Sequence, residues 1–235
     1  MTWEVPELFR ERLGDKPGRQ RAMFHEGHLL LVLHQPPQAD ETERRGRYFW
    51  RNPDGAWISN DLGSGSAALV KHLNEFHDQL QRLDKAEEDA LNAVEYFTVI
   101  DAICPLSRTI RHLHEVLQEA RQLIPKDREL LNIRDRSYEL DRSADLLLND
   151  ARNGLDFAIA RRSEQQAEEA HRMSTSAHRL NMHAAFFFPM ATLAAVLGTN
   201  LKHGWEDVSP PTPFLIMLGC GLLAGLLLQT FLRRK

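Results

Sequence analysis

The residues best suited to chemistry in this chain lie at the end of an apolar run. Phe186–Leu197 is followed directly by Gly198, Thr199 and Asn200, a small polar group between two apolar segments. Gly198 permits a helix to end and the backbone to turn there. The amide of Asn200 offers a neutral carbonyl oxygen as an acceptor. This arrangement indicates the passage of an ion rather than the catalysis of a reaction.

The second apolar run, Pro213–Leu232, predicts a membrane-spanning helix. It has twenty residues without a formal charge, and at about 1.5 Å rise per residue it covers a hydrocarbon core of roughly 30 Å. The first run is shorter, and extending it to 182–201 includes His183 and the polar group. A helix that lines a water-filled path can contain such residues. We therefore expect transmembrane helices at 182–201 and 213–232, joined by an external loop at 202–212.

Basic residues predict the orientation of these spans. Arg172 and Arg179 precede the first span, and a basic tail, 233–235, follows the second. By the positive-inside rule both termini are cytoplasmic, in a multi-pass protein of the cell (inner) membrane. Residues 1–20 lack the apolar core of a signal peptide. The loop residues Glu206 and Asp207 either attract cations to the mouth by their charge or are simply solvated.

A small β-containing region is expected at residues 1–62. A continuous apolar run at 29–33, and two aromatic segments around the turn signal at 52–55, predict a short sheet with a hairpin. A region of this size cannot bury a large hydrophobic core by itself, and we therefore expect the sheet to pack against helices. The aromatic residues fit either a ligand or base-stacking platform or packing, and we favour packing. They are Tyr48, Phe49, Trp50 and Trp57.

The following segment has an almost entirely helical pattern. Apolar residues recur at spacings of three and four from residue 69 to residue 83, which is typical of an amphipathic helix. We expect this stripe to continue through Leu91, Val94 and Phe97. A break or kink is then expected at Pro105.

A turn at Leu123-Ile124-Pro125 separates these helices from a much longer one. From Lys126 no further proline occurs until Pro189, so we expect a stalk helix of some sixty residues or more that runs into the first span. Such a helix needs antiparallel partners and copies of itself around an axis. The fold class is therefore mostly α with a small N-terminal sheet, and 63–181 forms the cytosolic helical hairpin and stalk.

This combination resembles the CorA family of divalent-cation transporters, also called the two-transmembrane GxN family. The matching residues are Phe187, Phe188 and Pro189, then Gly198 and Asn200 nine and eleven residues after that proline. The short loop, the terminal second span, the basic tail and the helix pair that feeds a stalk match as well. Thr199 stands where the family usually has Met, and the N-terminal region is much shorter than the family's.

The resemblance implies a homopentamer arranged around the first span, with Gly198, Thr199 and Asn200 as its selectivity filter. Magnesium dehydrates reluctantly, so a ring of Asn200 carbonyls would bind the hydrated ion without trapping it. The alternative is that Asn200 only caps a helix.

The family's pore-lining positions, carried down the first span, are apolar in this chain. Ala191 stands where typical members have a hydroxyl residue. Phe188 and Leu180 fit either an apolar constriction that gates by dewetting or ordinary helix packing. The four positions are Ala191, Phe188, Leu180 and Ala177.

Histidines on the stalk offer a different metal chemistry. His171, His178 and His183 fall near one helical face, with Glu164 and Glu168 above them. Imidazole suits zinc or cobalt better than magnesium. Solvated side chains on a polar stalk are the alternative, and we favour it.

The expected function is transport of Mg²⁺, with Co²⁺, Ni²⁺ or Zn²⁺ as alternatives, and without any cofactor. The rival is a membrane-anchored CorA-like sensor or effector with a ligand-gated or silent pore. The sequence has no phosphate-cradling glycine loop, Cys-x-x-Cys or nucleophile motif, so we expect no enzyme. The net charge of −4 gives no argument for nucleic-acid binding. The expected partners are the lipid bilayer, divalent cations and copies of the same chain.

Overall fold

The structure is a computed structural model that describes residues 3–14, 16–38, 44–198, 204, 209 and 211–233. The chain divides into two compact units, Met1–Arg161 and Arg162–Lys235. We call them the N-terminal unit and the C-terminal unit. The long helix α4, Arg128–Leu197, contributes to both. The predicted division of the chain into six segments stays a prediction.

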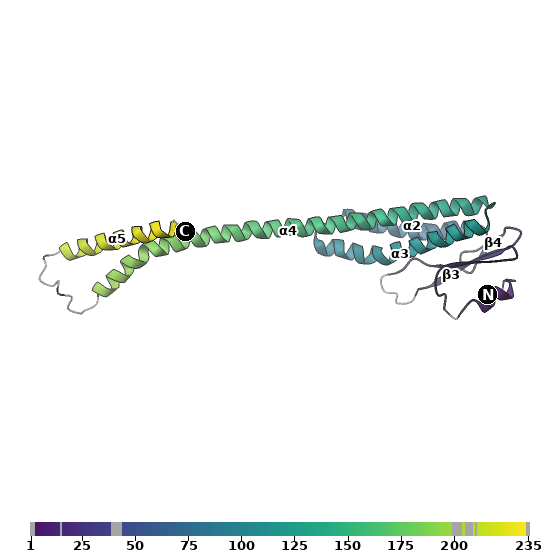
Figure 1. Ribbon diagram of the computed structural model, residues 1–235, viewed down its shortest axis with the longest axis horizontal. Coiled ribbons are helices and arrows are strands. Elements are labelled where there is room, and N and C mark those ends of the chain that lie inside the picture. Colours follow the sequence, from purple (N-terminus) through teal and green to yellow (C-terminus); the bar gives the residue numbers. More distant parts are fainter. Residues whose placement is uncertain are drawn as a thin grey trace. The chain divides into compact units, whose positions relative to one another are not determined.

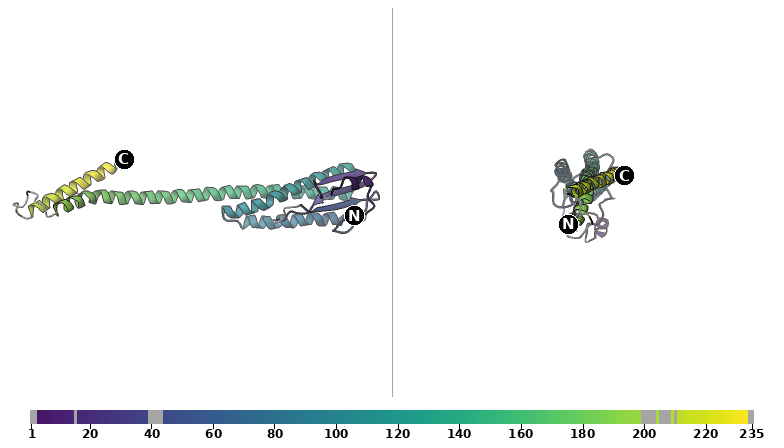
Figure 2. Two further views of the ribbon diagram at one scale, coloured as in Figure 1. Left: turned by 90° about the horizontal axis from the view of Figure 1, so that it is seen from below. Right: turned by 90° about the vertical axis from the view of Figure 1, so that its left-hand side faces the viewer.

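The N-terminal unit contains a four-stranded antiparallel sheet in the order β1-β2-β3-β4 (Figures 1 and 2). Its strands are β1 Arg21–His25, β2 His28–His34, β3 Gly46–Arg51 and β4 Trp57–Ser59. The predicted hairpin is confirmed, because β3 and β4 pair on either side of residues 52–56. The sequence argument missed β1, which pairs with β2 from Arg21 opposite Val32 to His25 opposite His28.

Both faces of the central strand β2 are buried, which explains its unbroken apolar run. Leu29, Leu31 and Leu33 belong to the main core, which the sheet shares with the helices. Leu30 and Val32 face the opposite way, toward a second cluster that includes Phe9 of the short helix α1, Glu7–Glu11. The sheet therefore packs against helices, as predicted. Its aromatic residues Phe49, Trp50 and Trp57 are buried in these two clusters, which supports packing over a stacking platform.

Helices α2, Ala67–Glu88, and α3, Ala93–Leu123, form the rest of this unit with the first part of α4. Figure 1 shows α2 and α3 lying along this part of α4. The core joins Leu73 and Phe76 of α2 to residues of α3 and α4. The mostly helical fold with a small N-terminal sheet and one long helix is confirmed.

The predicted continuation of the first apolar stripe is wrong. Helix α2 ends at Glu88, and the side chain of Asn92 caps a new helix by accepting hydrogen bonds from the backbone N–H groups of Val94 and Glu95, at 3.0 and 3.1 Å. The Glu95 carboxylate accepts a hydrogen bond from the Leu91 N–H in return, at 2.7 Å. The capping side chains thus override the apolar period. Leu91, Val94 and Phe97 are exposed as a result.

Of the break or kink predicted at Pro105, the break is absent, since α3 runs through this residue. A proline inside a helix costs about 3 kcal/mol because it removes one hydrogen bond and crowds the preceding turn. Here Ile103, Leu106 and Ile110 are fully buried around it. Burial of each such side chain contributes roughly 1.5–3 kcal/mol, which is enough to keep the helix continuous.

The turn predicted at 123–125 is confirmed, and Asp127 fixes the start of α4. Its Oδ1 accepts a hydrogen bond from the Leu130 N–H at 3.0 Å. Its Oδ2 pairs with Nε of Arg51 at 2.8 Å, and both side chains are largely buried. One carboxylate therefore joins the sheet to the beginning of the long helix.

A second buried polar group lies between β3 and α2. The Arg47 guanidinium donates to Oδ2 of Asp61 at 3.0 Å, to Oε2 of Glu75 at 2.8 Å and to Nδ1 of His72 at 2.9 Å. Burial, and then the charge of Arg47, lower the pKa of His72 to about 3. His72 is therefore neutral, and its edge-on contact with the Phe76 ring completes a structural cluster.

Candidate functional site

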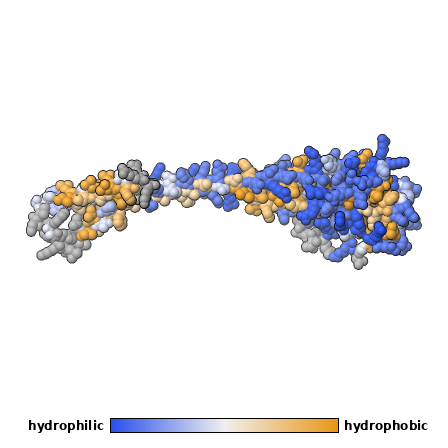
Figure 3. Space-filling view, in the orientation of Figure 1, coloured by the Kyte–Doolittle hydropathy of each residue, from blue (hydrophilic) through white to orange (hydrophobic). Residues whose placement is uncertain are grey.

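The C-terminal unit contains the expected membrane segment. Helix α5, Thr212–Arg233, includes Thr212–Phe231, which is long and apolar enough to cross a membrane by length and composition. Within the described residues it is the one helix that meets this criterion. Figure 3 shows hydrophobic residues gathered over α5 and the end of α4, and mostly hydrophilic ones over the N-terminal unit and the middle of α4. The pair of spans at 182–201 and 213–232 stays a prediction.

Two glycines bring α5 into close contact with the end of α4. A Cβ atom added to Gly225 would lie 2.6 Å from the backbone oxygen of Phe186. One added to Gly221 would lie 3.3 Å from Cα of Met190. Small residues four apart allow two helix backbones to approach closely within a membrane. The sequence argument missed this contact, although the Gly221-x-x-x-Gly225 spacing was visible.

This contact gives the end of α4 two different sides. Phe186, Met190 and Leu193 are half-buried, and they fall on the side that faces α5. At about 100° per residue, the opposite side of the helix carries Phe188 and Ala191. These two side chains are exposed. One side of α4 is thus covered within the chain and the other is open.

All four predicted pore-lining residues lie on this open side. Helical geometry places them in one sector that faces away from α5. The exposed fraction is 70% for Leu180 and 72% for Phe188, and both alanines are exposed as well. We call this surface the open face of α4. It consists of Ala177, Leu180, Phe188 and Ala191.

Polar side chains in the two apolar helices bond to their own helix. The Thr192 hydroxyl donates to the carbonyl oxygen of Phe188, and the Thr230 hydroxyl donates to that of Leu227, each at 2.8 Å. A lipid environment offers no partner for such groups, so internal hydrogen bonds make them acceptable there.

The predicted filter lies at the end of α4 and is described only at its first residue. Gly198 follows the helix directly, and its N–H donates to the Ala194 carbonyl at 2.9 Å. A Cβ at Gly198 would lie 2.8 Å from that same oxygen, so a larger residue would crowd the helix end. Thr199 and Asn200 lie outside the described residues, as do Glu206 and Asp207.

The stalk histidines do not share one face as closely as predicted. His171 and His178 are seven residues apart and align, whereas His183 is turned away by about a third of a circle. Its Nδ1 lies 2.7 Å from the Arg179 carbonyl oxygen. Within the described ranges, no group of three or more His, Cys, Asp or Glu residues is placed to hold a metal ion.

These features define a class by architecture: a helical unit with a small antiparallel sheet, and one long helix that leads to a C-terminal apolar helix. The structure of the full-length CmaX protein has this fold, with a TM-score of 0.56 and 14% sequence identity, over 99% of this chain and 83% of that chain. The CorA magnesium transporter from Methanocaldococcus jannaschii matches at a TM-score of 0.43 and 13% identity, over 98% of this chain and 84% of that chain. We base the fold assignment on the first match.

The chain matches no protein-family model and no curated protein.

Proposed function

We propose that the chain is one subunit of a CorA-like membrane transporter that conducts Mg²⁺ or a related divalent cation into the cytosol. The observation that carries this proposal is the open face of α4. Helix α5 occupies the opposite side through Gly221 and Gly225. The residues left uncovered include those on which the family's pore positions fall. The fold likeness to CmaX is consistent with this proposal.

The open face requires copies of the chain to become a pore. A single α4 cannot enclose a path, whereas several copies around an axis can place their open faces toward the centre. The family resemblance gives five copies. In that assembly α5 lies on the outer side toward lipid, where its exposed Leu223 and Leu227 meet an apolar solvent. Both termini are then cytoplasmic, in the cell (inner) membrane.

Selection of the ion is assigned to the end of α4. Gly198, Thr199 and Asn200 form the filter, and the Asn200 carbonyls bind the first-shell waters of the ion. Neutral acceptors hold a hydrated divalent ion more weakly than carboxylates do, so the ion can leave again. Glu206 and Asp207 attract cations toward this mouth.

Flux into proteoliposomes tests the proposal. The purified protein is reconstituted, and uptake of Mg²⁺, Co²⁺, Ni²⁺ and Zn²⁺ is compared for the wild type and Asn200→Ala. The matched control is Asn149→Ala, because Asn149 is exposed in the N-terminal unit. We expect uptake by the wild type and the control, and a loss of about tenfold or more in Asn200→Ala, because the ring of acceptors is gone. Equal uptake by all three proteins, or by none, contradicts the proposal.

A further inference from the structure

A polar cavity of about 400 Å³ opens in the N-terminal unit, between the edge of the sheet and helix α3. This volume lies in the range of small-molecule sites, which is about 300–1,000 Å³. Arg19, Arg21 and Arg44 line it from the sheet side, and Glu115 and Glu119 line it from α3. We call it the arginine cavity. None of its residues belongs to the proposed pore.

The guanidinium of Arg21 is held in place without a negative partner. Its Nη1 donates to the backbone oxygens of Pro17 and Arg19 at 2.9 and 3.0 Å, and its Nη2 donates to that of Arg12 at 3.2 Å. A guanidinium has five N–H donors, so Nε and one Nη2 hydrogen remain for another group. The backbone thus orients a full positive charge at the cavity.

Arg19 and Arg44, like Arg21, are not paired with a carboxylate among the described residues. Glu115 and Glu119 face them across the cavity instead of pairing with them. Among the described residues that line the cavity, three arginines therefore face two carboxylates, and the sheet side carries the positive charges.

The pKa of His34, which also lines the cavity, is affected by these positive charges. Burial lowers its pKa, and the charges of Arg44 and His112 lower it further, against a hydrogen bond to Gly18 that raises it. Its Nε2 lies 2.8 Å from the Gly18 oxygen, whereas its buried Nδ1 has no hydrogen-bond partner among the described residues. The cavity wall therefore contains a polar atom that its own protein neighbours leave unsatisfied.

The wall is also fixed in position, as a binding site requires. The side chain of Gln20 is buried and joins strand β2 to helix α3. Its Nε2 donates to the Thr109 oxygen at 2.9 Å, and its Oε1 accepts from the His34 N–H at 3.2 Å. These hydrogen bonds fix the positions of both sides of the cavity relative to each other before any ligand binds.

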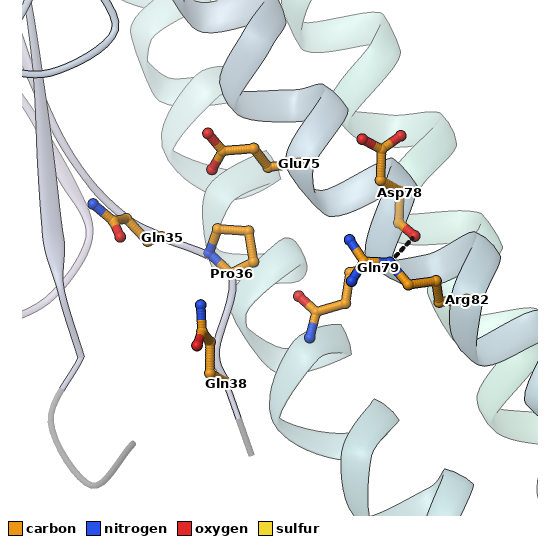
Figure 4. A pocket seen from close by; sticks show the side chains of 7 residues that line it. All are labelled: Gln35, Pro36, Gln38, Glu75, Asp78, Gln79 and Arg82. Carbon is orange, nitrogen blue, oxygen red and sulfur yellow. Dashed lines mark hydrogen bonds between the residues drawn. The ribbon is translucent and has the colours of Figure 1, made fainter. Parts of the chain in front are cut away.

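Another cavity of the N-terminal unit, of about 510 Å³, provides a contrast (Figure 4). Several of its polar side chains already form hydrogen bonds within the protein. Gln79 donates to the Pro37 oxygen at 2.9 Å, Glu75 pairs with Arg47, and Arg82 donates to the Asp78 oxygen at 3.3 Å. That cavity lies between the segment that follows β2 and helix α2. The arginine cavity instead has three arginines on its sheet side, and none of them is paired with a carboxylate among the described residues.

We propose that the arginine cavity binds a small phosphate-bearing anion. Guanidinium groups recognise phosphate oxygens through short charge-assisted hydrogen bonds. Arg21 supplies a preoriented charge, and Arg19 and Arg44 close around the anion from the exposed rim. This proposal does not depend on ion conduction, because the site lies wholly within the N-terminal unit.

Calorimetric titration of the full-length protein in detergent tests this site, with inorganic pyrophosphate as the probe. Divalent ions are removed with a chelator, and sodium chloride of equal ionic strength serves as the blank. We expect saturable binding by the wild type, and binding weaker by about tenfold or more in Arg19→Gln/Arg44→Gln. The matched control is Arg142→Gln/Arg152→Gln, which makes the same charge change at exposed positions of α4. It should bind as the wild type does.

A third variant keeps the test decisive if the first one fails to fold. Glu115→Gln/Glu119→Gln removes the two carboxylates that oppose the anion, so it should bind pyrophosphate several-fold more tightly. Circular dichroism checks the helical content of each variant. Absence of saturable binding by the wild type overturns the proposal. So does an equal loss in both arginine pairs, or an unchanged affinity in the glutamate variant.

Discussion

Single residues determine how closely the apolar helices approach. Gly225 lies against the backbone oxygen of Phe186, where there is no room for a side chain. Gly219 lies on the same helix, and a Cβ added there meets nothing within 4 Å. The same substitution at these two glycines should therefore have different effects, although both residues belong to the same apolar helix, α5.

Gly225→Ala should destabilise the C-terminal unit by about 1–3 kcal/mol, because the added methyl group overpacks the contact with α4. Gly219→Ala should leave stability unchanged or raise it slightly, since alanine is the better helix former. Thermal unfolding of both variants in the same detergent measures the difference. Equal midpoints for the two variants contradict the close packing of α5 on α4.

The buried His72 makes stability depend on pH in a defined direction. Its pKa of about 3 in the folded protein is below its ordinary value of 6.5, so the unfolded chain binds this proton more readily. The contribution of neutral His72 to the free energy of unfolding is fully present above about pH 6.5. As the pH drops toward 3, this contribution falls by up to roughly 1.4 kcal/mol per pH unit.

His72→Asn should reduce this acid sensitivity. The Asn amide oxygen can replace Nδ1 as an acceptor for Arg47 but does not titrate. Urea unfolding between pH 7 and pH 5 measures the effect through tryptophan fluorescence, since Trp3, Trp50 and Trp57 lie in the N-terminal unit. The variant should show a shallower loss of stability with falling pH. Identical pH slopes would show that His72 can be protonated without unfolding.

At the scale of elements, one carboxylate organises the start of the longest helix. Asp127 caps α4 through Leu130 and pairs with Arg51 of β3. Asp127→Ala should lose both contacts, at a cost of about 2–4 kcal/mol, because it also leaves Arg51 without its partner. Asp127→Asn should lose less, since an Asn side chain still caps a helix.

The same urea assay measures both Asp127 variants. An equal loss of stability in Asp127→Asn and Asp127→Ala would mean that the ion pair carries the whole effect. An unchanged stability in Asp127→Ala would contradict the joint role of this side chain.

The elements also show what sequence reasoning can reach. The apolar run of β2, the turn at 52–55 and the long stretch between Pro125 and Pro189 carry strong local signals, and these elements are present. The break between α2 and α3 was missed, because apolar spacing continues across it while the capping by Asn92 and Glu95 depends on two side chains. The four pore positions were named from a resemblance, and the exposure of Phe188 and Ala191 opposite α5 depends on how that helix packs.

At the scale of the whole molecule, the chain combines a compact N-terminal unit with a C-terminal unit in which α5 and the end of α4 are apolar and largely exposed. Phe188, Leu223 and Leu227 are more than 60% exposed. A contiguous apolar surface of this kind marks contact with lipid or with other protein copies. The proposed function assigns the open face of α4 to other copies around a pore, and the outer surface of α5 to lipid.

Thiol accessibility tests this central assignment most directly. Cys104 and Cys220 are free cysteines, so both are first replaced by alanine. Ala191→Cys then places a thiol on the open face, and Leu193→Cys places one on the half-buried side of the same helix. The reagent is a charged, membrane-impermeant methanethiosulfonate. It should reduce cation uptake by Ala191→Cys proteoliposomes about tenfold, because the reacted side chain obstructs the path, and leave Leu193→Cys unchanged. Equal inhibition of both variants, or inhibition of Leu193→Cys alone, would contradict a pore lined by the open face.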